Sequence, residues 1–566
     1  MNYKMNIENI YHRISLKTGL FLVGFTFLST GLFAQEEWEK NDGEIEDVEI
    51  QIVKDREITL PKANRNFEKI PPSSIVRTQP NLEYFFSNLN LPLPALNIRV
   101  RPLRMKDEPL NKLYGNYVKA GFGNYATPYL EGYFSNKRDN QMMYGAHFNF
   151  LDSRNGPVDG KNSGSGVMNG NVFGKYFGSK VTASGEVGFD RRRYNFYGYP
   201  ENQEVDADTL KQNFSVMHIQ GYLENTQADA KLSYLAGFQF DYLTDNYEAK
   251  ESEFQIDLNT GFDIGENTRA EIKSDLDIIS QKDVLLDVKT RNIFRVNPTL
   301  TFEYGGFLIN AGFKAIYEND TLGDSDEVHF YPVAKARYQL PSGFTVFAGI
   351  DGDIEKLTLR KLTNENPFLM PNAQAFNTNK TFQLYGGIEG SLSSKMGFRS
   401  GISVSTYKNM YYFLNSPLDQ SKFMVVYDQG STSLVNIYGE LSYNRNEALR
   451  FILRGDYWGY DTDEIQEAYH RPNYKVSAIS TYKLYDKFRF EAEAYMLGGI
   501  KAFDFNTGED IDLDAALDLN LKAEYLFSKQ FSAFIRLNNL LSNEYEVLYN
   551  YPSRGFQVLA GVTYSF

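Results

Sequence analysis

Hydrophobic and polar side chains alternate one by one along the end of the chain, from Gly555 to Phe566. Successive side chains of a β-strand point to opposite faces of its sheet, so this alternation predicts a strand with one almost wholly apolar face. A strand of this kind fits between lipid on one side and polar surroundings on the other. The residues of its apolar face are Phe556, Val558, Ala560, Val562, Tyr564 and Phe566.

Other segments alternate in the same way but carry charges on their second face. Between Leu513 and Tyr525, apolar residues alternate with a mostly polar set that includes Asp518 and Lys522, and segments 269–278 and 488–496 repeat the pattern. A slip of register by one residue would place these charges in hydrocarbon, at about 2 to 4 kcal/mol for each Arg or Lys near the midplane. The pattern therefore predicts a closed wall of strands with lipid outside, a wet interior and a fixed register.

Connections of two lengths separate these strands from about Tyr114 onward, and aromatic residues gather beside the short ones. This asymmetry is typical of barrels that stand in an outer membrane. Short turns are expected at 177–180, 265–267, 304–306, 341–343, 393–395, 485–487 and 527–529, and long loops at 152–163, 190–211, 355–379, 408–433 and 541–554.

The predicted fold class is therefore all-β. We expect a transmembrane antiparallel β-barrel of about 22 strands with short periplasmic turns and long extracellular loops. An even number is favoured because both ends of such a chain then lie in the periplasm. A soluble protein with several sheets is the alternative, and it is disfavoured because soluble sheets seldom combine a polar interior, two classes of loop and a terminal Phe.

The composition supports many half-apolar strands. The chain has 40 Tyr, 43 Phe and 44 Gly against 2 Trp, and no apolar run after the leader is long enough for a spanning helix. The net charge of −14 argues against a nucleic-acid partner. Because the sequence contains no cysteine, it excludes structural disulfides and a lipoprotein anchor.

The chain divides into three predicted regions. Residues 1–34 have the features of a secretory signal peptide, with basic residues before an apolar stretch and Ala34 as a small residue for cleavage. A retained membrane helix is disfavoured because the apolar stretch is too short to span a bilayer. Residues 35–112 are acidic and then rich in proline, which predicts an extended periplasmic segment, and residues 113–566 form the barrel.

Within the acidic segment, one short alternating stretch could add to the sheet edge of a partner. Its residues are Val48, Ile50, Ile52 and Val53.

The C-terminal region resembles two known patterns. A terminal Phe566 with Tyr564 two residues before it resembles the signal with which outer-membrane barrels are handed to their insertion machinery. The stretch 537–546, the loop Tyr551-Pro552-Ser553-Arg554-Gly555 and the last strand together resemble the closing segment of TonB-dependent receptors. The match is specific over roughly thirty residues and extends loosely over the barrel.

This resemblance implies a 22-stranded barrel that imports a scarce nutrient with energy from an inner-membrane partner and holds a globular plug in its lumen. The segment before the barrel is shorter than such a plug and lacks its glycine-rich character. We therefore expect a barrel without a recognisable plug. The Val48 to Val53 stretch is then a candidate for the segment that binds a TonB-like energising protein.

Catalytic and cofactor chemistry has no support in the sequence. The histidines His147, His218, His329 and His470 show no metal-ligand spacing, and no nucleotide-binding or hydrolase motif is present. Acidic loop clusters such as Asp461, Asp463 and Glu464 are interpreted as solvated loops rather than calcium sites. The run Arg191-Arg192-Arg193 is interpreted as exposed, with lipid phosphate as the alternative ligand. We thus predict no enzyme activity, no metal and no cofactor.

Two functions remain open at this stage for a protein of the Gram-negative outer membrane. The first is transport, with lipid, the insertion machinery and an energising protein as partners. The second is a scaffold role in a multiprotein outer-membrane complex for assembly or secretion, in which the N-terminal extension holds other outer-membrane or periplasmic subunits. Because lumen width grows with strand number, an unfilled barrel of this size would leave a wide aqueous hole, so something must occupy it. We expect inward-folded loops, chiefly 355–379 and 408–433, to close the lumen together with the N-terminal extension, and a separate protein is the alternative.

Overall fold

The computed structural model describes residues 114–137, 139–200, 203–206, 208–226, 231–286, 290–320 and 327–566. The predicted signal peptide, the N-terminal extension and its Val48 to Val53 stretch lie outside the described residues. Within the described part of the chain, no helix has the length and hydrophobicity of a membrane span.

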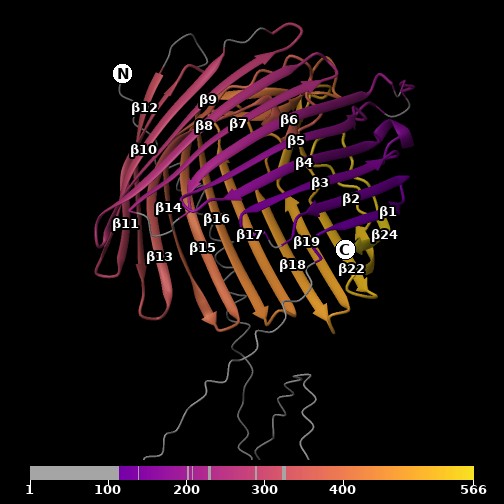
Figure 1. Ribbon diagram of the computed structural model, residues 1–566. Helices are drawn as coiled ribbons and strands as arrows, with labels where there is room; N and C mark the ends of the chain where they lie inside the picture. The colour runs from indigo at the N-terminus through magenta and orange to yellow at the C-terminus, as the bar shows by residue number, and fades with distance from the viewer. Residues whose placement is uncertain are drawn as a thin grey trace, which may run out of the picture. The chain divides into compact units, whose positions relative to one another are not determined.

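A single antiparallel sheet of 22 strands makes up the barrel, as predicted (Figure 1). Each strand pairs with the next along the chain, except that β19 pairs with β22, and β24 closes the ring on β1. The first strands are β1 (Tyr117–Gly123), β2 (Thr127–Ser135), β3 (Met142–Ser153), β4 (Ser165–Phe177), β5 (Val181–Asn195), β6 (Lys211–Asn225), β7 (Leu232–Asp245), β8 (Lys250–Gly265), β9 (Thr268–Lys282), β10 (Arg291–Tyr304), β11 (Phe307–Glu318) and β12 (Glu327–Gln339). The others are β13 (Phe344–Glu355), β14 (Thr378–Ser393), β15 (Met396–Asn415), β16 (Phe423–Arg445), β17 (Leu449–Asp461), β18 (Tyr474–Leu484), β19 (Phe488–Gly498), β22 (Ala516–Leu526), β23 (Phe531–Asn538) and β24 (Gln557–Ser565).

Three smaller elements lie in the connections. A 3-10 turn, η1 (Gly160–Ser163), follows β3, and a helix, α2 (Leu359–Glu365), follows β13. A two-stranded hairpin of β20 (Ile500–Asp504) and β21 (Glu509–Leu513) stands between β19 and β22. Leu513 therefore belongs to the hairpin, and the barrel strand expected to begin there begins at Ala516 instead.

The two ends of the barrel differ as expected, and we call them the turn end and the loop end. Every short turn named above joins two strands at the turn end. The prediction of a long loop at 408–433 is wrong, because β15 and β16 continue as a paired ribbon to Asn415 and Phe423. The pairing persists past a bulge after Lys408 because Tyr411, Tyr412 and Phe413 favour strands and are buried.

The alternation read from the last strand is confirmed in β24. Val562 and Tyr564 are 44% and 51% exposed on the outer face, whereas Leu559 and Thr563 on the inner face are 7% and 6% exposed. In β22, Leu517 is likewise exposed while the adjacent Asp518 is buried inside. Large apolar side chains are thus exposed on the outside of the wall, and charges face the lumen.

Candidate functional site

The connection between β13 and β14, residues 356–377, lies at the loop end of the barrel, and we call it the cap (Figure 1). It begins with helix α2, whose N-cap residue Thr358 accepts a hydrogen bond from the Lys361 backbone N–H at 3.1 Å. The apolar residues Leu357 and Leu362 are completely buried. A segment this short can bury such residues only by packing against other parts of the molecule.

Lys356 fixes the start of the cap to the inner wall of β8 and β9. Its Nζ lies 2.6 Å from a carboxylate oxygen of Asp277 and 3.0 Å from Gln255 Oε1, and it also pairs with Glu253. Gln255 and Asp277 stand directly opposite each other on the two strands. Burial lowers the pKa of Lys356, but the attraction of Glu253 and Asp277 outweighs it and the pKa is raised. The ammonium group therefore stays charged in the closed cap.

Arg360 makes the second attachment, one turn further on. Its guanidinium lies 2.9 Å from Asp241 and 3.5 Å from Glu253, two acids directly opposite each other on β7 and β8. Acids in that position repel, so the cap supplies the cation that offsets their repulsion. Next to them, the Glu251 carboxylate accepts hydrogen bonds from the backbone N–H groups of Leu359 at 2.6 Å and Arg360 at 3.0 Å. A carboxylate is favourable at this first turn of a helix.

The second half of the cap is held by hydrogen bonds between side chains and backbone, which reach both sides of the mouth. These bonds are Gln281 Nε2 to Ala373 O at 2.7 Å, Asn372 N to Asp283 Oδ2 at 2.7 Å, Asn377 N to Asp320 Oδ2 at 2.7 Å and Tyr427 Oη to Gln374 O at 2.8 Å.

An apolar cluster fills the space between the cap and its neighbours. Phe368 of the cap stacks on Tyr551 of the β23–β24 loop, with ring centroids 3.7 Å apart. Residues of the β5–β6 connection and of the β15–β16 ribbon complete the cluster, so distant parts of the wall meet over the lumen. Its buried members are Phe196, Leu210, Val216, Leu243, Ala249, Leu357, Leu359, Leu362, Phe368, Leu369, Ala373, Ala375, Tyr411, Phe413, Phe423 and Tyr551.

His470, in the β17–β18 loop, links this loop to the β15–β16 ribbon and to the β23–β24 loop. Its Nδ1 lies 2.8 Å from the carbonyl oxygen of Phe413, and its Nε2 lies 3.3 Å from the backbone nitrogen of Tyr549. A carbonyl must accept and a backbone N–H must donate, so the ring is neutral with its proton on Nδ1. Burial lowers the pKa of His470 to about 4, which agrees with this neutral state.

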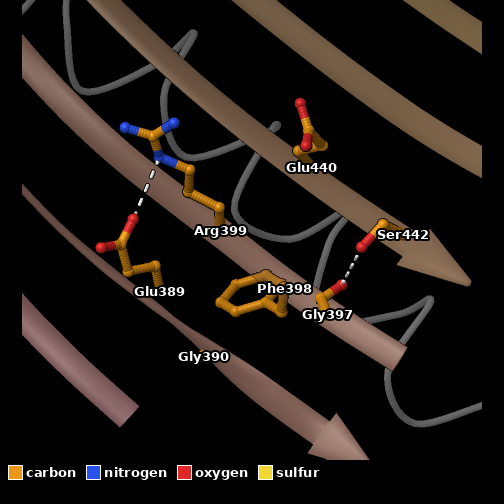
Figure 2. A pocket seen from close by; sticks show the side chains of 7 residues that line it. All are labelled: Glu389, Gly390, Gly397, Phe398, Arg399, Glu440 and Ser442. Atoms are coloured by element: carbon orange, nitrogen blue, oxygen red, sulfur yellow. Dashed lines mark hydrogen bonds and ion pairs between the residues drawn. The ribbon is translucent and has the colours of Figure 1, made fainter. Parts of the chain in front are cut away.

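Below the cap, the lumen wall carries alternating charges. Glu389, Arg399, Glu440 and Arg454 lie directly opposite one another in turn on β14, β15, β16 and β17. Figure 2 shows Arg399 beside Glu389. The two side chains form an ion pair at 3.4 Å and line a hollow of about 280 Å³ near the turn end. The side chain of Arg399 is 55% exposed, so this part of the wall faces solvent. Such a surface suits polar solutes of either charge sign.

The structure places the residues predicted from sequence as follows. Tyr564 and Phe566 lie on the outer face with ring centroids 5.8 Å apart, and their role in insertion stays a prediction. Arg192 corrects our interpretation of the arginine run, because it turns inward and donates to the Thr363 carbonyl of the cap at 3.3 Å. Across the described ranges, no group of three or more His, Asp or Glu side chains has a metal-binding arrangement.

The expected inward fold of loop 355–379 is confirmed by the cap, but its anchors were not foreseen. Of these anchors, only Asp277 lies in a segment whose alternation predicts a charged inner face; the sequence analysis did not single out Asp241, Glu251 and Glu253. The available signal was the close spacing of acids in this part of the chain, at Asp241, Glu251 and Glu253.

No protein-family model matches the sequence, and a search of curated proteins gives no match. Among solved structures, the FrpB iron transporter from Neisseria meningitidis (F3-3 variant) is similar, with a TM-score of 0.63, 11% identity, and 81% of this chain and 82% of that chain covered. The siderophore receptor PirA from Pseudomonas aeruginosa gives a TM-score of 0.55 at 14% identity, with 80% and 79% covered. A mutant of the ferric enterobactin receptor PfeA from the same organism gives 0.58 at 13% identity, with 80% of each chain covered.

At these identities the likeness is one of fold. It confirms the barrel architecture implied by the resemblance to TonB-dependent receptors, including its 22 strands.

Proposed function

We propose that this chain is a transport barrel of the Gram-negative outer membrane, with its loop end outside the cell and its turn end in the periplasm. The observation that carries the proposal is the cap, which ties both sides of the loop end together over a charged lumen wall. A barrel with an apolar outside and a polar inside offers a path for polar solutes, and such a path needs a seal. The fold shared with an iron transporter and with siderophore receptors supports the same function.

The way the cap is attached fits a gate rather than a permanent wall. Its polar attachments to β7, β8 and β9 are ion pairs and hydrogen bonds that involve side chains, and its apolar contacts are packing of side chains. The ladder bonds of the barrel depend on neither. The cap can therefore leave the mouth while the barrel strands keep their register. The partly exposed side chains of Lys356 and Arg360, at 24% and 32%, show that solvent reaches these attachments.

Conductance in planar bilayers tests the gate. We expect wild-type protein to show no steady large openings. The double variant Lys356→Met and Arg360→Met should show them, because the cap then loses both cations that pair with Asp241, Glu253 and Asp277. The matched control is Lys361→Met, which removes a lysine of the same helix that lies over the Tyr411 ring at 5.8 Å and forms no ion pair with a described residue. Steady openings in wild-type protein would disprove the seal, and a silent double variant would disprove its control by the cap.

The energising partner is part of the same proposal. We propose that residues Val48 to Val53 recruit a TonB-like protein, since a short alternating stretch can pair with a sheet edge. Deleting residues 36–53 tests this. Loss of co-purification with the energising protein, with other barrels assembling normally, supports transport. Unchanged growth on every scarce nutrient together with failed assembly of other barrels would instead support the scaffold function.

A further inference from the structure

Three basic residues lie in one row across the outer wall of the barrel. Arg191 of β5 is opposite Ser215, Ser215 is opposite Thr244, Thr244 is opposite Lys250, and Lys250 is opposite Lys282 of β9. The row thus crosses five neighbouring strands at right angles to them, and because the strands of such barrels tilt by about 35–45°, the row is inclined to the membrane plane. With strands about 4.8 Å apart, it spans roughly 19 Å.

The row faces outward, and its part on β5, β6 and β7 stands just above the apolar belt, whereas Ser252 and Ser280 lie below the two lysines on β8 and β9. Two residues nearer the turn end on β5, β6 and β7 lie Phe189, Met217 and Tyr242, which are 40%, 43% and 38% exposed. Side chains two positions apart share a face, so Arg191 and its row neighbours point the same way as these lipid-facing residues. The rise between the two levels is about 7 Å. Arg191, Lys250 and Lys282 are themselves exposed.

Among the residues that the structure describes, these three cations have none of the ion-pair partners that nearby outer basic residues have. Arg193 pairs with Asp152 at 2.7 Å and Lys211 pairs with Asp208 at 2.5 Å. By contrast, Arg191, Lys250 and Lys282 make no ion pair or side-chain hydrogen bond with any residue that the structure describes. Lys250 and Lys282 also stand directly opposite each other, which is unfavourable for two like charges unless an anion lies between them.

We propose that this row binds the phosphate groups of an anionic lipid in the outer leaflet. Arg and Lys form strong charge-assisted hydrogen bonds with phosphate. A lipid whose chains lie along the Phe189, Met217 and Tyr242 surface brings its headgroup to the Arg191 end of the row, and the row leads from there to the lysine pair. A lipid with two phosphates reaches both Arg191 and the lysine pair. The proposal rests on the membrane location given under the proposed function, but it does not depend on transport.

Native mass spectrometry of the full chain in detergent tests the row. The probe is lipid A, a glycolipid with two phosphates, with phosphatidylcholine and inorganic phosphate in separate titrations. In the variant Arg191→Gln, Lys250→Gln and Lys282→Gln, we expect lipid A affinity to fall about tenfold, because three charge-assisted contacts are lost. The control variant removes three exposed lysines at the turn end: Lys395→Gln, Lys487→Gln and Lys529→Gln.

Each result decides the proposal. A tenfold loss in the row variant alone supports it, and equal loss in both variants or no loss in either overturns it. Equal binding of phosphatidylcholine, or displacement of lipid A by millimolar inorganic phosphate, also overturns the choice of an anionic lipid. The shift of the folded band on unheated gels verifies that the row variant has formed its barrel. The conductance of the row variant should equal that of wild type. A failure of the lipid-site proposal can therefore be distinguished from a failure of the gate proposal.

Discussion

Replacing Glu253 with glutamine should loosen the cap while leaving the barrel closed. The Glu253 side chain is 3% exposed and meets both cap cations, Lys356 and Arg360. Removing one partner from a fully buried pair costs about 3 to 5 kcal/mol. The two cations are partly exposed and keep Asp277 and Asp241 as partners, so we reduce this to about 1.5 to 3 kcal/mol. That loss raises the opening constant of the cap by roughly 10-fold to 150-fold.

Amide hydrogen exchange of peptides from residues 356–377, measured by mass spectrometry in lipid nanodiscs, reports this constant directly. We expect protection of the cap to fall by that factor and protection of β7 and β8 to stay as in wild type. The control is Glu493→Gln, an exposed acid of β19 without an ion pair to any described residue. Unchanged exchange in the cap of the Glu253→Gln variant would refute the reasoning, and so would equal loosening by Glu493→Gln.

A double-mutant cycle separates the pair from general loss of stability. If Glu253 and Lys356 act as a pair, the variant that carries both Glu253→Gln and Lys356→Met should lose less protection than the sum of the two single variants. Full additivity would show that the two side chains act independently.

Three further predictions follow from the wall and its loops. Burial lowers the pKa of His470 to about 4 from its ordinary 6.5, so its contribution to the free energy of unfolding is complete above pH 6.5 and falls by up to about 3 kcal/mol as the pH drops toward 4. Thermal unfolding between pH 4 and 7 should show this loss in wild type, and His470→Gln should lack it. Replacing Tyr564 and Phe566 with alanine should reduce the heat-modifiable barrel in cells but not refolding in detergent. Leu519→Arg should destabilise the barrel in phospholipid vesicles by about 2 to 4 kcal/mol in urea titrations, and Lys522→Arg, on the lumen side of the same strand, should not.

Much of the fold could be predicted from sequence because its main determinant repeats every two residues. A strand such as β24 separates lipid from water by itself, and Val562 and Thr563 differ in exposure as their polarity predicts. The short turns could be predicted as well, because turn-forming residues mark them within a few positions of the sequence. The extent of β15 and β16 could not, because the mostly polar stretch from Asn415 to Lys422 suggests a loop, while the pairing that carries the ribbon past the bulge after Lys408 depends on residues 423–428 of the next strand.

The site was predictable only as a loop that folds inward. Its contacts join residues that are far apart in the chain: Lys356 reaches Gln255 across 101 positions, and Arg192 reaches Thr363 across 171. No local pattern carries that information. Charge balance offers a partial signal, since Asp241 and Glu253 would repel across their strands without a cation from elsewhere. The sequence alone does not say which of many lysines and arginines supplies it.

The cap can attach only if β8 and β9 pair in the correct register, and the same register places their apolar residues in the membrane. Glu251, Glu253 and Asp277 reach the cap because Ile256 and Ile278 point into lipid on the same strands. If β8 slipped by one residue, its acids would face hydrocarbon and the cap would lose its attachments at the same moment. The attachment site also needs three strands already paired, because Asp241, Glu253 and Asp277 come from β7, β8 and β9. The cap can therefore close only on a correctly registered wall, so closure follows strand pairing during assembly.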